Sequence, residues 1–525
     1  MSIEEILSKT WDAIVIGTGI GGGTIGRRLA EAGAKVLFVE YGPYGPSTEE
    51  QDGYPVGDEY SRMLHGIWPS DASITSNGET TSVDFGIGAG VGGTSSFYAS
   101  TLERPAPEDI DETDSRPHPT GGWPVKYAEF DRYFAEAEHL YHVVGERNPV
   151  EPSGKNAIAP PKQDTEYQKK LRQFFQTYGL NPYRSPTGAK FLDNCKMCFG
   201  RKCPRGCKMD GRTAGVDPAL ATGNAELLDW CEAVRFHGTT DAIDQLEVRC
   251  KGKTFLLNAK VFILSAGALN SPRILQRSIS EYWPNGCANG SGLLGQNLMF
   301  HLNEFFAVWS GLHHDGSEYS KTFSMKDFYT SGQFRLGVFQ ALGVSADYRT
   351  ISHFLSQSVE KGSSLKQTFK HHSTHFVSTI AAKVLGNAEL YVGILEDFPN
   401  TENHVANGGE RTDQIKVVYN VSDELLSRRA VFTKMINEAL PRRRRLHLNR
   451  LPQINHAHAC GTARFGDDAG ASVLDRNCRA HDLHNLFCVD SSFMPTSNGV
   501  NPSLTIAANA LRVGDHIIEN ALFST

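Results

Sequence analysis

The sequence predicts an α/β fold in which a Rossmann-like nucleotide-binding domain is interleaved with an α+β substrate-binding domain. Two strand–turn–helix units, one at the N-terminus and one near the middle of the chain, predict the nucleotide-binding domain. Between and after them the sequence changes to proline-rich, acidic and aromatic stretches, which predict a second domain built from separate segments. A chain of 525 residues is long enough to bury two large cores.

The N-terminal unit has the spacing of a dinucleotide-binding motif. An apolar strand is expected at residues 11–16, a helix follows the turn, and a second strand at residues 35–40 ends in Glu40. The glycines of the motif are Gly17, Gly19 and Gly22. In such motifs the first glycine makes the turn, the second lets the backbone approach a pyrophosphate, and the third allows close packing. The acidic residue about twenty positions further on holds ribose hydroxyls, so Glu40 is the expected ribose ligand.

A second glycine-rich segment occupies residues 85–98. Its glycines would let the backbone lie against a flat ligand or phosphates, and hydroxyl side chains follow them. The expected cofactor contacts are Gly92, Gly93, Thr94 and Ser95. A flexible loop is the alternative interpretation.

The second strand–turn–helix unit ends near residue 272. Short strands are expected at residues 233–236, 246–250 and 254–257. A buried strand at residues 260–264 then runs into a small-residue turn and a helix. Val234 and Ala266 are the expected cofactor contacts of this unit.

These transitions divide the chain into five segments. An amphipathic helix at residues 127–141 is typical of the first excursion out of the nucleotide-binding domain. We expect nucleotide-binding segments at residues 1–103, 191–300 and 446–525, and substrate-binding segments at residues 104–190 and 301–445.

Four cysteines crowd into residues 195–207 of the middle segment: Cys195, Cys198, Cys203 and Cys207. Four thiolates could hold zinc or an iron–sulfur cluster. Their spacing, however, fits neither a standard zinc pair nor the common ferredoxin run. We therefore predict structural cysteines, with metal binding as the alternative.

The C-terminal stretch carries the expected reaction centre. His458 ends a short strand just before a Gly-Thr turn, and Asn501 precedes Pro502, which suits the first position of a helix. The N-terminus of such a helix exposes N–H groups and the positive end of its dipole, which favour negative charge. A base beside this helix end suits the oxidation of an alcohol by a cofactor that becomes negative when reduced.

Each candidate in this stretch has an alternative. His456 is the rival base, and because His456, His458 and Cys460 share one face of a strand, a small metal site is also conceivable. Asn501 could serve as a helix N-cap. Three further histidines, expected in a surface loop because they lack an acidic or thiol partner at helical spacing, are His371, His372 and His375.

Composition narrows the class of protein. The net charge of −7 argues against a nucleic-acid binder, and the one basic run, at residues 442–445, is expected to form a solvated face. No apolar run approaches the length of a membrane span. The polar N-terminus lacks a signal peptide, so we expect a cytoplasmic protein whose ten cysteines are free thiols or metal ligands.

Taken together, these motifs resemble the glucose–methanol–choline (GMC) family of flavin oxidoreductases over nearly the whole chain. The matching segments are the Gly17–Gly22 turn with Glu40, residues 91–95, residues 266–272, residues 458–466 and residues 501–505. The resemblance implies two lobes, with the FAD lobe assembled from N-terminal, middle and C-terminal segments. It also implies oxidation of CH–OH groups, often on sugars or other polyols.

The resemblance also implies roles for individual residues. The catalytic pair of the family maps to His458 and Asn501, with His458 taking the hydroxyl proton while hydride passes to flavin N5. Asp490 would bind the ribityl or diphosphate part of FAD. The start of the helix at Pro502 and Ser503 would stabilise charge on the reduced flavin. Some members link the flavin to a histidine at the position held here by Phe97, so non-covalent FAD is expected.

Three functional classes follow. The leading one is an FAD-dependent dehydrogenase or oxidase of a small alcohol or sugar, with oxygen, a quinone or a protein as electron acceptor. The second is a non-redox flavoprotein lyase. The third is an FAD subunit that relays electrons to a protein partner through a cluster held by the four cysteines.

Overall fold

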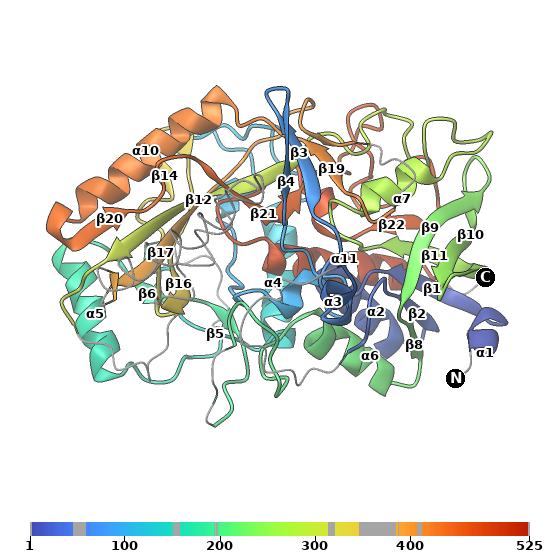
Figure 1. The fold of residues 1–525 in the computed structure, drawn as a ribbon, viewed down its shortest axis with the longest axis horizontal. Helices are drawn as coiled ribbons and strands as arrows, with labels where there is room; N and C mark the ends of the chain where they lie inside the picture. The colour runs from blue at the N-terminus through green and yellow to red at the C-terminus, as the bar shows by residue number, and fades with distance from the viewer. Residues whose placement is uncertain are drawn as a thin grey trace, which may run out of the picture.

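Two large sheets organise the chain (Figure 1). The structure is a computed structural model that describes residues 3–45, 59–150, 158–193, 195, 198–312, 321–345, 385–386, 388–406 and 412–522. The three histidines at residues 371–375 lie outside these residues. The expected α/β fold is confirmed, because one sheet is mostly parallel and covered by helices while the other is antiparallel.

The first sheet, which we call the nucleotide sheet, has the strand order β8-β2-β1-β11-β10-β9, and β22 also pairs with β11. Its strands are β1 (Thr10–Ile16), β2 (Val36–Val39), β8 (Ala225–Leu228), β9 (Cys231–Gly238), β10 (Ile243–Cys250), β11 (Lys253–Leu264) and β22 (Leu486–Cys488). The strands β8, β2, β1, β11 and β22 pair in parallel. The apolar runs of β1 and β2 are buried almost throughout, as expected for strands with both faces covered.

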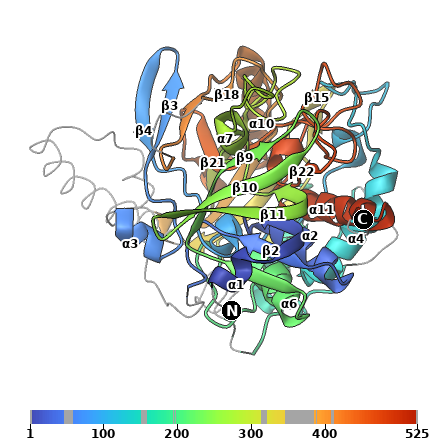
Figure 2. The ribbon, with the colours of Figure 1, turned by 90° about the vertical axis from the view of Figure 1, so that its right-hand side faces the viewer.

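Helices from distant parts of the chain pack around the nucleotide sheet (Figure 2). They are α2 (Ile20–Glu31), α4 (Tyr127–Leu140), α6 (Asp217–Ala221), α7 (Ser271–Arg277) and α11 (Ser503–Glu519). Helix α11 lies against both α2 and α4, and α7 packs on β9. The C-terminal helix therefore joins a layer begun at the N-terminus.

The second sheet has the strand order β20-β12-β17-β16-β13-β6, with β21 also paired to β12. Its strands are β6 (Tyr183–Arg184), β12 (Met299–Val308), β13 (Phe323–Met325), β16 (Phe339–Ser345), β17 (Glu389–Leu395), β20 (Arg445–His447) and β21 (Gln453–Cys460). Two amphipathic helices share a hydrophobic core with this sheet: α5 (Glu166–Thr177) and α10 (Asp423–Ala439). This core is separate from that of the nucleotide sheet.

Smaller elements complete the described chain. A four-stranded sheet contains β3 (Ala72–Ser76), β4 (Glu79–Val83), β18 (His404–Val405) and β19 (Lys416–Val418). The remaining helices and strands are α1 (Ile3–Leu7), α3 (Glu59–Leu64), β5 (Val143–Val144), β7 (Thr187–Gly188), β14 (Thr330–Ser331) and β15 (Phe334–Arg335). Within the described ranges, every helix is too short or too polar to span a lipid bilayer.

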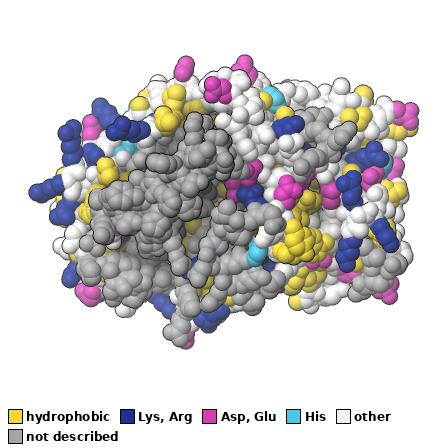
Figure 3. Space-filling view, in the orientation of Figure 1, with side chains coloured by type: hydrophobic (Ala, Val, Ile, Leu, Met, Phe, Trp, Pro, Cys, Tyr) yellow, Lys and Arg dark blue, Asp and Glu magenta, His cyan; other side chains and the backbone are white. Residues whose placement is uncertain are grey.

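Several sequence expectations need adjustment. The strands expected at residues 254–257 and 260–264 are one continuous strand, β11. β21 lies in the segment assigned to nucleotide binding but pairs with β12 of the second sheet, so the five segment boundaries stay a prediction. Lys and Arg side chains gather at the end of the molecule formed by α10 and β20 (Figure 3), where Arg442 and Arg443 are exposed as expected.

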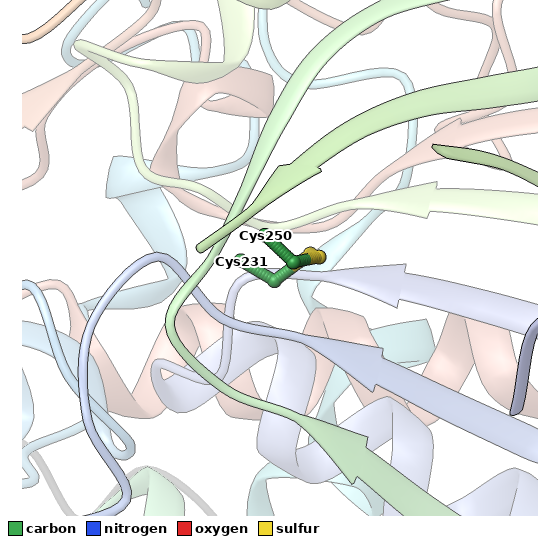
Figure 4. Close-up of a disulfide and its surroundings, with 2 residues drawn as sticks. All are labelled: Cys231 and Cys250. Carbon is green, nitrogen blue, oxygen red and sulfur yellow. A yellow bond between two sulfur atoms is a disulfide. The ribbon is translucent and has the colours of Figure 1, made fainter. Parts of the chain in front are cut away.

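A disulfide joins Cys231 of β9 to Cys250 of β10 (Figure 4). The expectation that all ten cysteines are free thiols or metal ligands is therefore wrong for this pair. The antiparallel register explains the bond, because it places the two residues directly opposite each other. The other eight cysteines carry free thiols. Disulfides persist mainly in oxidising compartments, so this bond does not favour the predicted cytoplasmic location.

Candidate active site

The register of the parallel strands brings the predicted cofactor residues together. Ile16 of β1 pairs with both Val39 of β2 and Leu264 of β11, so these three strands end at the same level. Gly17, Glu40 and the turn after β11 consequently meet at one edge of the nucleotide sheet. This carboxyl edge is where ligands bind in open α/β sheets.

A cavity of about 510 Å³ opens at this edge and extends to the second sheet. The predicted cofactor residues in its wall are Gly17, Gly19, Glu40, Gly93, Thr94, Ser95, Ala266, Asp490, Pro502 and Ser503. Both α2 and α11 begin in the wall, so two helix N-termini face the cavity. Their N–H groups and dipoles favour negative charge.

The glycines of the first turn differ in their surroundings. Gly17 has a φ of +91°, and a Cβ there would lie 2.3 Å from the Ser265 carbonyl oxygen. A Cβ on Gly19 would meet nothing within 4 Å, so this backbone is open to a ligand. Gly22 packs against the Gly17 carbonyl and lies outside the cavity wall, in agreement with its expected packing role.

Glu40 links β2 to the glycine turn. Its Oε2 accepts hydrogen bonds from the backbone N–H of Thr18 at 3.0 Å and from the Thr18 hydroxyl at 2.5 Å. Burial raises the pKa of Glu40 to about 7, against the lowering effect of these hydrogen bonds. The carboxyl group thus holds the turn and also lines the cavity, where a ribose hydroxyl could reach it.

Asp490 ties the C-terminal segment to the turn after β11. Its Oδ2 accepts from the Gly267 N–H at 2.9 Å and from the Ser271 hydroxyl at 2.5 Å. Its Oδ1 accepts from the Ser492 N–H at 2.8 Å. The structure thus gives Asp490 a local anchoring role in addition to its place in the cavity wall.

Two further members of the predicted cofactor-binding set, besides Gly22, lie outside the wall. Gly92 has a φ of +98°, and a Cβ there would lie 2.4 Å from the Ser96 hydroxyl oxygen, so this glycine shapes the loop. On β9 the neighbour Ala233 lines the cavity instead of Val234. The cavity borders the start of β9, where Cys231 and Glu232 line it as well as Ala233, and it ends one residue before Val234.

Strand β21 carries both candidate bases into the cavity wall. The His456 ring stacks on Phe85, with ring centroids 4.4 Å apart. His458 contacts His301 of β12, and the two Nδ1 atoms are 3.0 Å apart. Burial lowers the pKa of His456 to about 4 and holds the pKa of His458 well below its usual range. Both imidazoles are therefore neutral near pH 7.

His301 is completely buried and bonded at both ring nitrogens. Its Nε2 lies 2.8 Å from the carbonyl oxygen of Asn498. Burial lowers the pKa of His301 to about 4, so this ring is neutral as well. A carbonyl oxygen can only accept, which places the single ring hydrogen of His301 on Nε2.

Asn501 has a comparable neighbour in the second sheet. Gln340 of β16 donates from Nε2 to the Asn501 Oδ1 at 3.0 Å. Helix α11 begins at Ser503, and Asn501 lies just before it in the cavity wall. The bond to Gln340 occupies the Asn501 oxygen and leaves its Nδ2–H₂ group to face a ligand.

Sequence reasoning missed His301, Gln340 and Lys321, all of which line or border the cavity whose wall holds His458 and Asn501. None belongs to a motif. A usable signal existed for His301 and Gln340, which lie in apolar stretches: His301 lies between Phe300 and Leu302, where a buried polar side chain needs a reason.

The four clustered cysteines form close thiol contacts. The Cys203 and Cys207 sulfurs are 3.3 Å apart, and those of Cys195 and Cys207 are 3.8 Å apart. Across the described residues, no group of three or more His, Cys, Asp or Glu side chains is arranged to hold a metal ion. The zinc and iron–sulfur alternatives, and the metal site at His456, His458 and Cys460, are therefore not supported.

Comparisons with known proteins match this architecture. Residues 12–303 match the N-terminal model of GMC oxidoreductase and residues 413–510 match the C-terminal model. The 6'''-hydroxyparomomycin C oxidase of Streptomyces lividus is 26% identical, covering 96% of this chain and 90% of that protein. The 2-methyl-1,2-propanediol dehydrogenase of Mycolicibacterium austroafricanum is 25% identical, covering 96% and 95%.

Solved structures share the fold at low sequence identity. Pyridoxine 4-oxidase from Mesorbium loti superposes with a TM-score of 0.63 at 19% identity, covering 97% of this chain and 99% of that one. A formate oxidase variant of Aspergillus oryzae RIB40, made to study FAD modification, gives a TM-score of 0.65 at 14% identity, covering 98% and 99%.

Proposed function

The chain belongs to the GMC oxidoreductase family, and from that premise we propose that it oxidises a CH–OH group of a small alcohol or sugar to a carbonyl. His458 is the base, Asn501 binds the reacting oxygen, and FAD is held without a covalent bond. The observation that carries the proposal is the shared cavity, whose wall contains both the nucleotide motif and His458 with Asn501.

The names of the relatives support the reaction class. The Streptomyces and Mycolicibacterium relatives are named as an oxidase and a diol dehydrogenase, and a fructose dehydrogenase large subunit from Gluconobacter japonicus is 23% identical over 98% of this chain. These names place alcohol and sugar oxidation among the activities to test first.

The residues present fit FAD. Gly19 leaves open space for a pyrophosphate at the start of α2, and Glu40 offers a carboxylate for the ribose. Pro502 and Ser503 bring the N-terminus of α11 to the cavity, where its dipole would favour negative charge on the reduced flavin. Phe97, which the family resemblance aligns with the flavin-linking histidine of some members, lines the wall. When bound, FAD would accept the hydride from the substrate carbon.

The histidine pair defines which atom of His458 acts as base. Because His301 donates its Nε2–H to the Asn498 carbonyl, its Nδ1 carries a lone pair and accepts from His458. The hydrogen of His458 must then lie on Nδ1, which leaves Nε2 unprotonated. An unprotonated imidazole nitrogen in the cavity wall is suited to take the proton of a substrate hydroxyl.

Asn501 binds the substrate oxygen while His458 takes the proton. With its oxygen held by Gln340, its Nδ2–H₂ can donate to the oxygen of the substrate. A hydroxyl placed between His458 and Asn501 would thus give its proton to one residue and keep its oxygen bound to the other. This arrangement stabilises negative charge on that oxygen as the proton leaves.

Replacement of His458 by alanine tests the proposal. We expect the rate of anaerobic flavin reduction by substrate to fall by about 100- to 10,000-fold, the usual contribution of a general base. FAD should remain bound, because His458 lies at the substrate end of the cavity. In the wild-type protein, loss of the flavin colour when substrate is added without oxygen would also exclude the lyase alternative.

His456→Ala is the matched control, since His456 lies on the same strand and in the same wall but stacks on Phe85. It should retain most of the reduction rate. Normal reduction by His458→Ala together with loss of reduction by His456→Ala would assign the base to His456 instead.

A further inference from the structure

A buried lysine lies at the catalytic end of the cavity. Lys321 precedes β13, is only 4% exposed and lines the cavity wall. Within the described residues, its ammonium group has neither a hydrogen-bond acceptor nor an ion-pair partner. A buried charge without a partner destabilises the folded protein, so its presence indicates a functional role.

The nearby carboxylate does not neutralise Lys321. The charge that acts on Lys321 is that of Glu103, which itself accepts a hydrogen bond from Tyr183 and forms an ion pair with Lys326 at 3.4 Å. The single Glu103 carboxylate therefore interacts with two lysine side chains, and positive charge is in excess at the site when both lysines are protonated. Burial disfavours the charged form of Lys321 and lowers its pKa to about 7. A bound anion would stabilise the charged form and raise this pKa.

Lys321 acts at the site of the proposed chemistry. Lys321 and His458 line the same cavity, and the charge of Lys321 contributes to lowering the pKa of His458. The wall around it also has two buried acceptors that lack donors, the Asn303 Oδ1 and the Gln340 Oε1. Leu342, Val392 and Ile394 supply an apolar side.

We propose that the substrate is a hydroxy acid whose carboxylate pairs with Lys321 while the hydroxyl to be oxidised lies between His458 and Asn501. This inference rests on the proposed function and names its substrate class. One ammonium group matches a monovalent carboxylate, whereas a phosphate dianion is usually held by several donors. Additional hydroxyls of a sugar acid would supply donors for Asn303 and Gln340.

Ligand binding to the FAD-loaded protein provides a test that needs no turnover. The probes are acetate and acetamide, which have similar shapes and differ in charge, and binding is followed by the change in the visible flavin spectrum. We expect wild-type protein to bind acetate at least about 10-fold more tightly than acetamide. Lys321→Met should lose this preference, and Lys321→Arg should keep it.

Three results of the titration would overturn the inference: no binding of acetate, equal binding of acetate and acetamide by wild-type protein, or an unchanged preference in Lys321→Met. A general lack of alcohol oxidation would count against the proposed function instead, because the titration does not depend on it.

Turnover with matched substrates adds a second measurement. D-Gluconate and D-glucitol share a carbon chain and differ in the carboxylate, as do lactate and 1,2-propanediol. Lys321→Met should lower kcat/KM about 100-fold more for the acids than for their neutral partners. An equal loss for acid and neutral substrates would mean that Lys321 acts on the reacting hydroxyl, which contradicts carboxylate recognition.

Discussion

The nucleotide sheet and the second sheet present different chemical groups to the cavity that they share. The nucleotide sheet contributes mainly backbone, at glycine turns and helix N-termini such as those at Gly17 and Gly19. The second sheet contributes side chains, among them His301 on β12 and Gln340 on β16, which hold the two proposed catalytic residues.

This difference separates binding from catalysis. Backbone that approaches a cofactor is sensitive to any added side-chain atom, whereas side chains that orient a base affect the rate and leave the cofactor in place. Changes in the nucleotide sheet should therefore remove FAD, and changes in the second sheet should slow a protein that still contains FAD.

The largest effect is expected from Gly17→Ala. A Cβ at this position would lie 2.3 Å from the Ser265 carbonyl oxygen, so the turn and the start of α2 must shift. We expect the purified variant to lack FAD, as measured by the flavin absorbance per protein, and to show no substrate oxidation.

Gly33→Ala is the matched control for backbone strain. Its φ of +92° is close to the +91° of Gly17, but a Cβ at Gly33 would meet nothing within 4 Å. Both variants carry the penalty of about 1–2 kcal/mol for a left-handed alanine, and Gly17→Ala alone adds the clash. Equal loss of FAD in the two variants would show that strain, not the approach to the cofactor, explains the effect.

A smaller effect is expected from His301→Leu in the second sheet. Without the acceptor on His301, His458 is free to carry its hydrogen on either ring nitrogen, and the basic nitrogen is no longer oriented. We expect kcat to fall by about 10- to 100-fold, with FAD retained and KM nearly unchanged.

His301→Gln should recover part of this loss, because an amide can donate to the Asn498 carbonyl and accept from His458. If His301→Leu loses FAD, the proposed division between the two sheets is wrong. A merely structural role for His301 would give equal defects in the leucine and glutamine variants.

The smallest effect is expected in the dependence of the flavin reduction rate on pH. Burial lowers the pKa of His458 below its ordinary value near 6.5, so the base is already neutral at pH 6.5 and stays neutral as the pH rises. With a neutral substrate, the rate of flavin reduction should be flat from about pH 6 to pH 8 and should fall only in more acidic solution. A midpoint near 6.5 would indicate an exposed histidine and would contradict the buried pair.

The nucleotide sheet could be predicted largely from sequence because its signals are local. Gly17, Gly19 and Glu40 follow a short motif in which the turn, the helix and the ribose ligand lie within one unit. The position of Asn501 before Pro502 likewise indicates a helix start, and α11 begins at Ser503. Val234 lies one residue beyond the part of β9 that lines the cavity, and local sequence does not indicate how far along a strand a cavity extends.

The second sheet could not be predicted in the same way. His301 and His458 are bonded although 157 residues separate them, and Gln340 and Asn501 are 161 residues apart. Such pairs depend on the strand order of a sheet built from distant segments, for which no local pattern exists. The cysteines of residues 195–207 show the limit of local spacing in another way, since their closeness in sequence left metal binding open as an alternative and the described residues form no metal site.

The strand order of the nucleotide sheet also bears on how the protein folds during synthesis. β1 pairs with β11, which begins about 240 residues later, and β22 joins the far side of β11 only near the end of the chain. At translation rates of roughly 5–20 residues per second, β11 is synthesised about 10 to 50 seconds after β1. During that time the apolar edge of β1 is open to pairing with other chains. The nascent protein is therefore expected to depend on chaperones until the ribosome has made most of it.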